Sequence, residues 1–487
     1  MAHSLGSSSV LGRGGFDHAL RIYEINTRLR GSFDQITVSE LKELAALGFD
    51  WLWPMGVWRI GEGARKISKI ISDDFEGSPY AVESYEISPW LGGQTGFQSL
   101  VARAHDAGLK VMVDFVSNHT ALDSPWIDED ATQFIRSDTS VRGQSTGDYF
   151  LHTSGEVVAY GRDPYFPPWH DTAQLDYSNP RLRARMIDVL KRISRMADGV
   201  RCDMAMLVLK DYFRERWYPR AGEKWFDQRM PGEFWDRAIE EVKSERPDFL
   251  FIAEAYWDKE PQLLDLGFDL AYEKKLYDGL ATANSQAVIE RLKRPVGALL
   301  KSVCFIENHD EPRAASVFTR EGNIAAAALV LSLPGAALIH EGQIEGRRER
   351  LPVQILKPRT DEPIDLRLSA EYKRLLQITS REIFKRGSFE LFERGIYGVV
   401  SFIRRYDTGA VAYLGQVSEG WHRFSSVQLN LSALAESTVM SRHLRVTNLL
   451  TSRSVTVDTS GGVIQSSLAE LGVEDGDLFC LLEASPA

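Results

Sequence analysis

Cysteine is scarce in this sequence. Cys202, Cys304 and Cys480 are the only three among 487 residues, and they lie far apart. Such spacing gives neither a disulfide framework nor a zinc-ligand pattern, and an odd number leaves at least one thiol free. The chain also lacks a run of about 18 uninterrupted apolar residues, which a membrane-spanning helix needs. Together these absences predict a protein of a reducing, cytoplasmic compartment with no membrane span.

Positive charge is not in excess either. The 57 Lys and Arg residues face 68 Asp and Glu residues, which gives a net charge of −11. This balance argues against nucleic acid or an anionic membrane surface as a partner and is compatible with a neutral ligand. The segment Met1 to Gly15 is rich in Ser and Gly and lacks the apolar core of a signal peptide, so we expect no secretion signal there.

Short apolar runs alternate with helical patterns along most of the chain. Continuous apolar runs are typical of parallel strands that are covered on both faces, and alternating strands and helices imply right-handed crossovers. Eight such units predict a closed (β/α)8 barrel, and a doubly wound sheet with two accessory domains is the alternative. The runs are Leu20–Asn26, Phe49–Pro54, Leu109–Val116, Gly199–Cys202, Phe249–Ala253, Phe268–Ala271, Val303–Ile306 and Ala336–Ile339.

Two regions depart from this alternation. Between the third and fourth runs the chain is too long for one crossover helix, so residues 121–174 are predicted to form a small inserted domain. Short alternating runs after Lys385 predict an antiparallel β-sandwich over residues 386–487. The barrel then comprises residues 1–120 and 175–385. The C-terminal runs are Val399–Arg404, Ala410–Tyr413, Ser426–Leu429 and Leu478–Leu482.

Acidic side chains stand where three of the predicted strands end. Asp203, Glu254 and Asp310 follow the fourth, fifth and seventh runs. Chemistry in such barrels is located at the carboxyl ends of the strands. Neighbouring strands lie about 4.8 Å apart, so carboxyl groups at their ends can approach about 5–5.5 Å, the separation of retaining glycoside hydrolysis.

The neighbours of these acids fit that chemistry. Arg201 lies on the same strand face as Asp203 and is expected to keep this carboxyl ionised, as a nucleophile requires. Apolar residues around Glu254 are expected to raise its pKa so that it can donate a proton. His119 and His309 could donate hydrogen bonds to sugar hydroxyls. Taken singly, each of these residues could instead have a structural role.

Four motifs together resemble glycoside hydrolase family 13, the α-amylase family. They occur in the order of that family, which also has an inserted domain after the third strand and a C-terminal β domain. Two shorter segments, Gln174–Pro180 and Ser78–Tyr85, are similar to family segments as well. The motifs are Asp114–His119, Gly199–Asp203, Glu254 and Asn308–Asp310.

The resemblance implies a retaining enzyme that acts on α-glucosidic bonds of an α-glucan or α-linked oligosaccharide. It assigns Asp203 as nucleophile, Glu254 as acid/base and Asp310 as transition-state stabiliser. Asp114 is left to a bracing role. The expected substrate-binding residues are Tyr80, His119, Arg201, His309 and Trp257.

The sequence departs from the family pattern after the nucleophile. Starch-degrading relatives carry Lys-His there, whereas this chain has Met206 and Leu207, which are poorly suited to binding a long glucan by hydrogen bonds. The charged segment His340–Arg348 is either a solvated loop or a rim that contacts sugar or an anionic acceptor. No cofactor is required by the expected chemistry, and Asn118 and Asp176 are candidate ligands of a structural calcium ion.

Other functions remain open on these residues. A transglycosylase or glycoside phosphorylase would share the covalent intermediate and differ only in the acceptor. A catalytically silent carbohydrate-binding or scaffold protein would be expected to lack one of the three acids, and this chain retains them all. A metal-dependent barrel hydrolase would need ligands such as His119, Asp203, His309 and Asp310 to gather. Substrate length, linkage and oligomeric state are left open.

Overall fold

The computed structural model describes residues 18–137, 147–356, 362–391, 398–417, 428–430, 443–458, 465–467, 469–473 and 477–486. The segment Met1 to Gly15 lies outside these ranges, as do residues 426–427 of one predicted C-terminal run. No helix in the described ranges is both long and apolar enough to cross a membrane.

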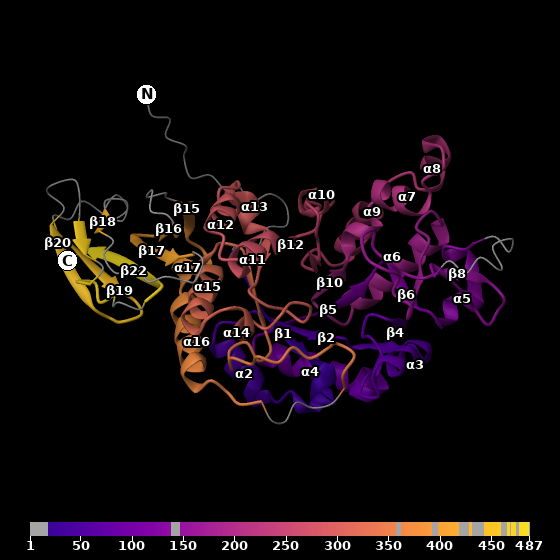
Figure 1. The fold of residues 1–487 in the computed structure, drawn as a ribbon, viewed down its shortest axis with the longest axis horizontal. Coiled ribbons are helices and arrows are strands. Elements are labelled where there is room, and N and C mark those ends of the chain that lie inside the picture. Colours follow the sequence, from indigo (N-terminus) through magenta and orange to yellow (C-terminus); the bar gives the residue numbers. More distant parts are fainter. Residues whose placement is uncertain are drawn as a thin grey trace.

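Eight parallel strands close into a barrel in the order β1-β14-β13-β12-β11-β10-β5-β2 (Figure 1). Each coincides with one of the eight predicted runs, so the prediction of a (β/α)8 barrel is confirmed. The strands are β1 (Arg21–Asn26), β2 (Trp51–Met55), β5 (Lys110–Val116), β10 (Gly199–Asp203), β11 (Leu250–Ala253), β12 (Leu270–Tyr272), β13 (Ser302–Cys304) and β14 (Ala336–His340).

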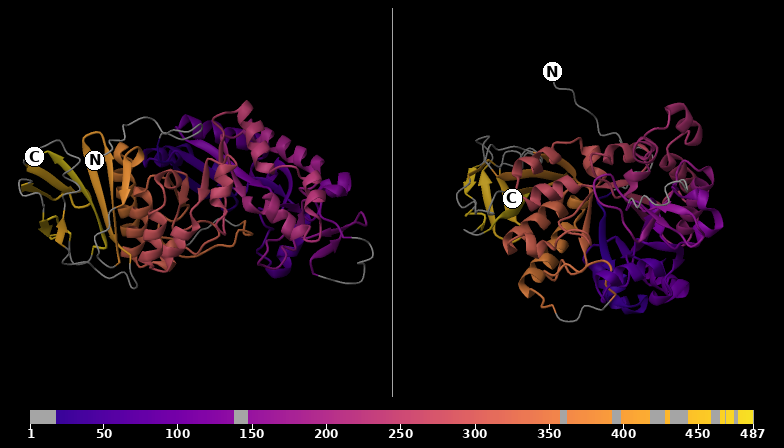
Figure 2. Two further views of the ribbon diagram at one scale, coloured as in Figure 1. Left: turned by 90° about the horizontal axis from the view of Figure 1, so that it is seen from above. Right: turned by 45° about the vertical axis from the view of Figure 1, so that its right-hand side comes forward.

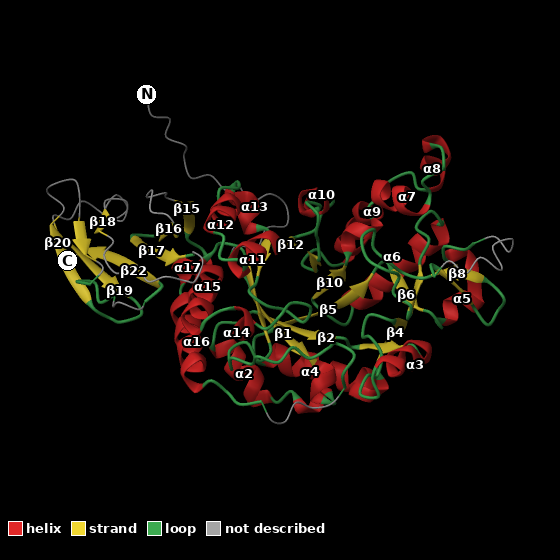
Figure 3. Cartoon of the chain, in the orientation of Figure 1, coloured by secondary structure: helices red, strands yellow, loops and turns green. Residues whose placement is uncertain are grey.

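Helices cover the outside of the barrel (Figure 3). Thr37 caps the N-terminus of α2 by accepting a hydrogen bond from the backbone N–H of Glu40, and Gly48, with φ +88°, follows its C-terminal end. The helices are α1 (Thr27–Arg30), α2 (Val38–Ala46), α3 (Glu62–Ile71), α4 (Gly93–Asp106), α5 (Pro125–Asp130), α6 (Pro180–Ser194), α7 (Lys210–Trp217), α8 (Glu223–Arg229), α9 (Phe234–Glu245), α10 (Glu260–Asp265), α11 (Lys274–Ala281), α12 (Ser285–Leu292), α13 (Val296–Leu300), α14 (Ala314–Val317), α15 (Arg320–Ser332), α16 (Leu366–Thr379) and α17 (Glu382–Lys385).

Short antiparallel pairs project from the carboxyl ends of the early barrel strands. Strands β6 and β9 pair directly after β5, with His119 opposite Gln174, so the chain leaves and re-enters the barrel beside the third strand. Figure 2 shows these segments at the opposite end of the molecule from the C-terminal sheet. The pairs are β3 (Trp58–Ile60) with β4 (Val82–Ile87), β6 (His119–Ala121) with β9 (Thr172–Gln174), and β7 (Tyr149–Leu151) with β8 (Val157–Ala159).

The C-terminal region forms a six-stranded antiparallel sheet in the order β15-β16-β17-β22-β19-β20, with a second sheet of β18 and β21. This confirms the predicted antiparallel C-terminal β domain. The strands are β15 (Ser388–Leu391), β16 (Val399–Tyr406), β17 (Gly409–Gln416), β18 (Gln428–Asn430), β19 (His443–Asn448), β20 (Ser454–Asp458), β21 (Gln465–Ser467) and β22 (Phe479–Pro486).

Candidate active site

Arg201 on β10 joins two of the predicted acids. Its side chain is 1% exposed, and Nη1 donates a hydrogen bond of 2.7 Å to Oδ1 of Asp203. Nη2 forms an ion pair of 2.8 Å with Oε2 of Glu254. One guanidinium therefore holds the two carboxylates on adjacent strand ends within the same small volume.

The pairing of β10 with β11 sets the two acids at the same level. Cys202 lies opposite Ala253, and the next residues along the strands are Asp203 and Glu254. Glu254 accepts hydrogen bonds of 2.7 Å from the backbone N–H of Met204 and from the hydroxyl of Tyr256. These contacts fix both oxygens of Glu254 in one orientation.

Glu254 is suited to exchange a proton near neutral pH. Burial, opposed by the positive charge of Arg201 and assisted by the negative charges of Asp203 and Asp310, raises its pKa to about 7. A carboxyl group with this pKa is protonated in part of the enzyme at neutral pH and can act as both acid and base. The expectation that the surroundings of Glu254 raise its pKa agrees with this result.

Two opposing influences act on the pKa of Asp203. We expected Arg201 to keep this carboxyl ionised. Burial acts more strongly than the guanidinium, and together with the negative charges of Asp114 and Asp310 it raises the pKa of Asp203 above its ordinary value. The direct hydrogen bond from Arg201 still favours the ionised form that a nucleophile needs.

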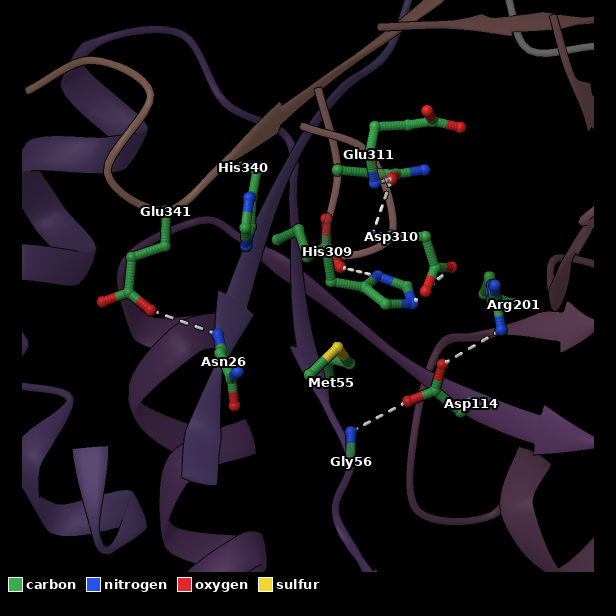
Figure 4. Close-up of polar contacts among 12 residues, drawn as sticks. Asn26, Met55, Gly56, Asp114, Arg201, His309, Asp310, Glu311, His340 and Glu341 are labelled. Carbon is green, nitrogen blue, oxygen red and sulfur yellow. Dashed lines mark hydrogen bonds and ion pairs between the residues drawn. The ribbon is translucent and has the colours of Figure 1, made fainter. Parts of the chain in front are cut away.

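Asp310 lies beyond the end of β13 rather than on it. The strand ends at Cys304, and Oδ1 of Asn308 accepts hydrogen bonds of 2.9 Å from the backbone N–H groups of Asp310 and Glu311. This local turn replaces the strand ladder and directs Asp310 toward His309 (Figure 4). The Asp310 side chain is 45% exposed, so it is the most accessible of the three acids.

His309 and Tyr80 border Asp310. Nε2 of His309 lies 3.0 Å from Oδ2 of Asp310 and 2.7 Å from the Tyr80 hydroxyl. Loss of hydration opposes ionisation of Asp310, but attraction to His309 and Arg201 outweighs it and lowers the pKa of this carboxyl. The Tyr80 ring also lies 5.4 Å from the Arg201 guanidinium, so three predicted substrate-binding residues meet here.

His119 is the fourth predicted binding residue in this region. It is 4% exposed and its ring lies 5.1 Å from that of Trp169, between β6 and the segment that returns to the barrel. Burial, opposed by a hydrogen bond to the backbone of Tyr80, lowers the pKa of His119 to about 4. His119 is therefore neutral at ordinary pH and can donate or accept one hydrogen bond at each ring nitrogen according to its tautomer.

A family model of the alpha-amylase catalytic domain matches residues 39–371, which include all three acids. The chain belongs to the alpha-amylase family.

The chain spans about half the length of the curated relatives that it matches. Alpha-amylase MalA of Haloarcula japonica is 26% identical over 343 residues, 68% of this chain and 44% of that protein. Alpha-amylase 3 of Dictyoglomus thermophilum is 23% identical over 296 residues, 56% of this chain and 54% of that protein. A maltogenic alpha-amylase of Thermotoga neapolitana shares the fold, with a TM-score of 0.71 at 21% identity over 95% of this chain and 98% of that one.

In this alpha-amylase family protein, the Trp257 side chain makes none of the contacts described above between the three acids and Arg201. Its ring packs against Tyr165, with centroids 4.8 Å apart, and stacks on Tyr212 at 5.9 Å.

Met206 and Leu207 are buried, at 0% and 5% exposed. The apolar residues that replace Lys-His therefore pack into the core.

Sequence reasoning did not single out three buried residues around the acids. Trp53 on β2 and Tyr272 on β12 place their rings 5.4 Å and 5.8 Å from the Arg201 guanidinium. Glu24, in the middle of β1, is 0% exposed and hydrogen-bonds Nδ1 of His309. A buried-strand pattern with an acid between Tyr23 and Ile25 was the signal that could have identified Glu24.

Asp114 on β5 has a bracing role, but it braces the segment after β2 rather than the loop after β5. Its Oδ2 accepts a hydrogen bond of 2.9 Å from the backbone N–H of Gly56, and its backbone carbonyl accepts one of 2.7 Å from the Trp58 indole. Its Oδ1 lies 3.8 Å from Nη1 of Arg201 (Figure 4). Asp114 thus links β2 to the guanidinium that joins the other acids.

The candidate calcium ligands do not fit a calcium site. The side-chain oxygen of Asn118 accepts a hydrogen bond of 3.0 Å from the Gln174 amide. Asp176 accepts one of 2.7 Å from the Tyr218 hydroxyl and one of 2.9 Å from the Ser178 backbone. Calcium needs six to eight oxygen ligands, and no three His, Cys, Asp or Glu side chains in the described part of the chain gather as metal ligands.

A cavity of about 500 Å³ adjoins His309 on the side away from Glu254. It opens where β1, β13 and β14 end, and the loop after β14 that sequence analysis singled out forms one wall. Both acidic and basic side chains face it, a mixture that suits the donor and acceptor hydroxyls of sugars. The lining includes Asn26, Asn308, His309, Glu341, Glu345 and Arg347.

Proposed function

We propose that this protein is a retaining glycosidase that cleaves α-glucosidic bonds in α-glucans or α-linked oligosaccharides. The observation that carries the proposal is the placement of Asp203 and Glu254 on one Arg201 guanidinium, with the pKa of Glu254 near 7. Family membership supports the same reaction. The activity requires one carboxylate to attack and a second, protonated carboxyl group to assist departure of the leaving group.

In the proposed reaction Asp203 attacks the anomeric carbon while Glu254 protonates the departing glycosidic oxygen. The bond from the sugar to Asp203 forms as the glycosidic bond breaks. The ionised Glu254 then removes a proton from water, which attacks the same carbon and releases Asp203. Asp310, whose pKa is lowered by His309 and Arg201, stabilises the positive charge that develops on the sugar ring.

Tyr80, His119, Arg201 and His309 are proposed to contact the sugar at the reaction centre or to orient its acids. Trp257 is proposed to contact the leaving group, because it follows Glu254 on the same loop beside two exposed or partly exposed tyrosine rings. These roles are the ones that the family resemblance implies, and each of these residues lies in a position on the barrel that is compatible with its role.

The cavity of about 500 Å³ supports a substrate with at least two sugars on the donor side. Strands β11 and β1 stand on opposite sides of the closed ring, so this cavity faces away from the acid that serves the leaving group. Nitrophenyl α-maltoside should therefore be cleaved with a higher kcat/KM than nitrophenyl α-glucoside. Equal values for the two would show that the cavity does not bind a donor-side sugar.

Transfer to a sugar or to phosphate would use the same covalent intermediate. We propose water as the main acceptor.

We also propose the domain division predicted from the sequence, with the insert at 121–174 and the C-terminal domain from 386. A reducing compartment is supported by the three cysteines, which are all buried and unpaired.

A time-resolved proton NMR experiment on maltotetraose tests the proposal. Retention predicts that the new reducing end appears first as the α-anomer and then mutarotates. The same assay with added phosphate or maltose measures competing phosphorolysis and transfer. First appearance of the β-anomer, or no cleavage by folded protein, would refute the retaining α-glycosidase.

A further inference from the structure

A row of three side chains, buried at Glu24 and His309 and exposed at Asp310, links the interior of β1 to the reaction centre. Oε1 of Glu24 hydrogen-bonds Nδ1 of His309, and Nε2 of His309 lies 3.0 Å from Oδ2 of Asp310. We infer that Glu24 is a positioning residue of the reaction, which holds His309 as a doubly protonated imidazolium so that Asp310 stays ionised and correctly aimed. This inference rests on the role proposed for Asp310.

The contacts of His309 with two acids favour a ring that carries two protons. Ionised carboxylates only accept hydrogen bonds, and His309 has one at each ring nitrogen. A neutral imidazole would turn a lone pair toward either Glu24 or Asp310. With both nitrogens protonated, the ring donates to both acids, and the Tyr80 hydroxyl at 2.7 Å can also accept from Nε2.

Other charged groups around His309 come from several strands. Arg201 on β10 and His340 on β14 favour the ionised form of Glu24, and Asp114 on β5 interacts favourably with a positive His309 ring. The two carboxylates in direct contact dominate, because they are the nearest charges. Burial lowers the pKa of His309, but attraction to Asp310 and Glu24 outweighs it and raises this pKa well above its ordinary value.

Glu24 depends on His309 in return. Its side chain is fully buried, and Oε2 has no hydrogen-bond partner among the described residues. Burial raises the pKa of Glu24, but His309, by charge and hydrogen bond, outweighs it together with His340 and Arg201, so the net shift is downward. A purely structural acid could be satisfied by neutral donors, whereas this acid faces an ionisable ring that in turn contacts Asp310.

The functional consequence concerns alkaline pH. Without the Glu24 charge, the pKa of His309 should fall toward the ordinary value of about 6.5. The ring would then lose its proton in the working pH range and leave Asp310 without its cationic partner. Catalysis should fail progressively above that pH, although Asp203 and Glu254 are unchanged.

The test compares Glu24→Gln with the wild-type protein on α-glucosyl fluoride. Fluoride leaves without a proton from Glu254, and kcat/KM reports only the steps up to formation of the covalent intermediate. Wild type should therefore show no fall in kcat/KM above neutral pH. Glu24→Gln should show a new alkaline limb, with a loss of at least about tenfold between pH 7 and pH 9.

Matched variants separate positioning from general stability. Glu24→Asp keeps the charge and should restore part of the alkaline plateau. Glu273→Gln removes another buried acid, which pairs with Arg291 and Arg294 away from the reaction centre, and its pH profile should parallel wild type. A Glu24→Gln profile that is also parallel to wild type would overturn the inference.

A second measurement does not depend on the variant folding. The ring nitrogens of His309 in wild type, identified in 15N spectra by comparison with His309→Gln, should both be protonated at about pH 8. Titration of the ring near its ordinary pKa would overturn the inference. Failure of wild type to cleave α-glucosyl fluoride would instead contradict the proposed function, and the ring signal would still decide the state of His309.

Discussion

At the scale of single residues, Glu254 determines how activity depends on pH. Its pKa of about 7 is raised above the ordinary value, so the protonated form is lost as pH rises through 7. Cleavage of a maltooligosaccharide needs that proton. We expect kcat/KM to fall about tenfold per pH unit above this value. A rate that stays constant to about pH 9 with this substrate would contradict the acid role.

Substitution of Glu254 tests the same role with two leaving groups. Glu254→Gln should lower kcat/KM for maltooligosaccharides by about 10²–10⁴-fold and should affect α-glucosyl fluoride much less, because fluoride needs no proton. Asp258→Asn, an exposed acid on the same loop, is the control and should behave as wild type. Equal losses on both substrates would mean that Glu254 does not act as the acid.

The residue scale also shows what the sequence could and could not predict. Asp203 and Glu254 were predicted because each directly follows an apolar run, and such positions lie at the carboxyl end of the barrel. Glu24 was not, because its role arises from an encounter with His309, 285 residues away. The extent to which burial raises the pKa of Asp203 against its neighbour Arg201 could not be predicted either, because it depends on the folded environment.

At the scale of elements, Arg404 on β16 connects the C-terminal sheet to the barrel. Its guanidinium donates a hydrogen bond of 2.7 Å to the carbonyl of Ser332, at the end of α15. It also donates to the carbonyls of Gly387, at 2.8 Å, and Ser388, at 3.1 Å. It is 1% exposed. Loss of these bonds would leave buried carbonyl groups unsatisfied.

Arg404→Ala should therefore lower the free energy of unfolding by about 3 kcal/mol, measured by thermal or denaturant unfolding. The control is Arg405→Ala on the same strand, whose partly exposed side chain pairs with Glu390. That change should cost under about 1 kcal/mol. Similar losses for both variants would show that the buried carbonyl contacts are not what stabilises this junction.

The junction of β6 and β9 leads to a prediction about metal. The Gln174 amide engages the Asn118 oxygen that could otherwise bind calcium. We expect a strong chelator to leave activity unchanged and to shift the Tm by less than about 1 °C, because the Asn118 oxygen already has the Gln174 amide as its partner. A Tm that falls by several degrees and recovers with added calcium would contradict this.

Element prediction succeeded where local pattern decides the structure. All eight barrel strands overlap their predicted runs, because strands covered on both faces need continuous apolar sequence. The ends were less predictable: β13 stops at Cys304, before the end of the predicted run, and the chain then turns at Asn308, whose side chain accepts the N–H of Asp310. The pairs β3–β4 and β7–β8 were not predicted, because their short strands lie among turn-forming residues.

At the scale of the whole molecule, the barrel places the site between two peripheral regions. The C-terminal sheet lies at one end and the segments around β7 and β8 at the other (Figure 2). The three acids come from the ends of β10 and β11 and from the loop after β13, which lie within four consecutive strands of the barrel, so the order of the strands brings them together. The central claim is that this convergence forms one reaction centre, with Asp203 as the group that attacks.

Covalent trapping tests this claim most directly. A 5-fluoro-α-glycosyl fluoride forms the intermediate faster than water releases it, and peptide mass spectrometry then locates the attached sugar. The account predicts a stoichiometric label on Asp203, which is lost when wild type is first blocked with a competing inhibitor. A label on Glu254 or Asp310, or steady turnover with no labelled residue, would contradict it.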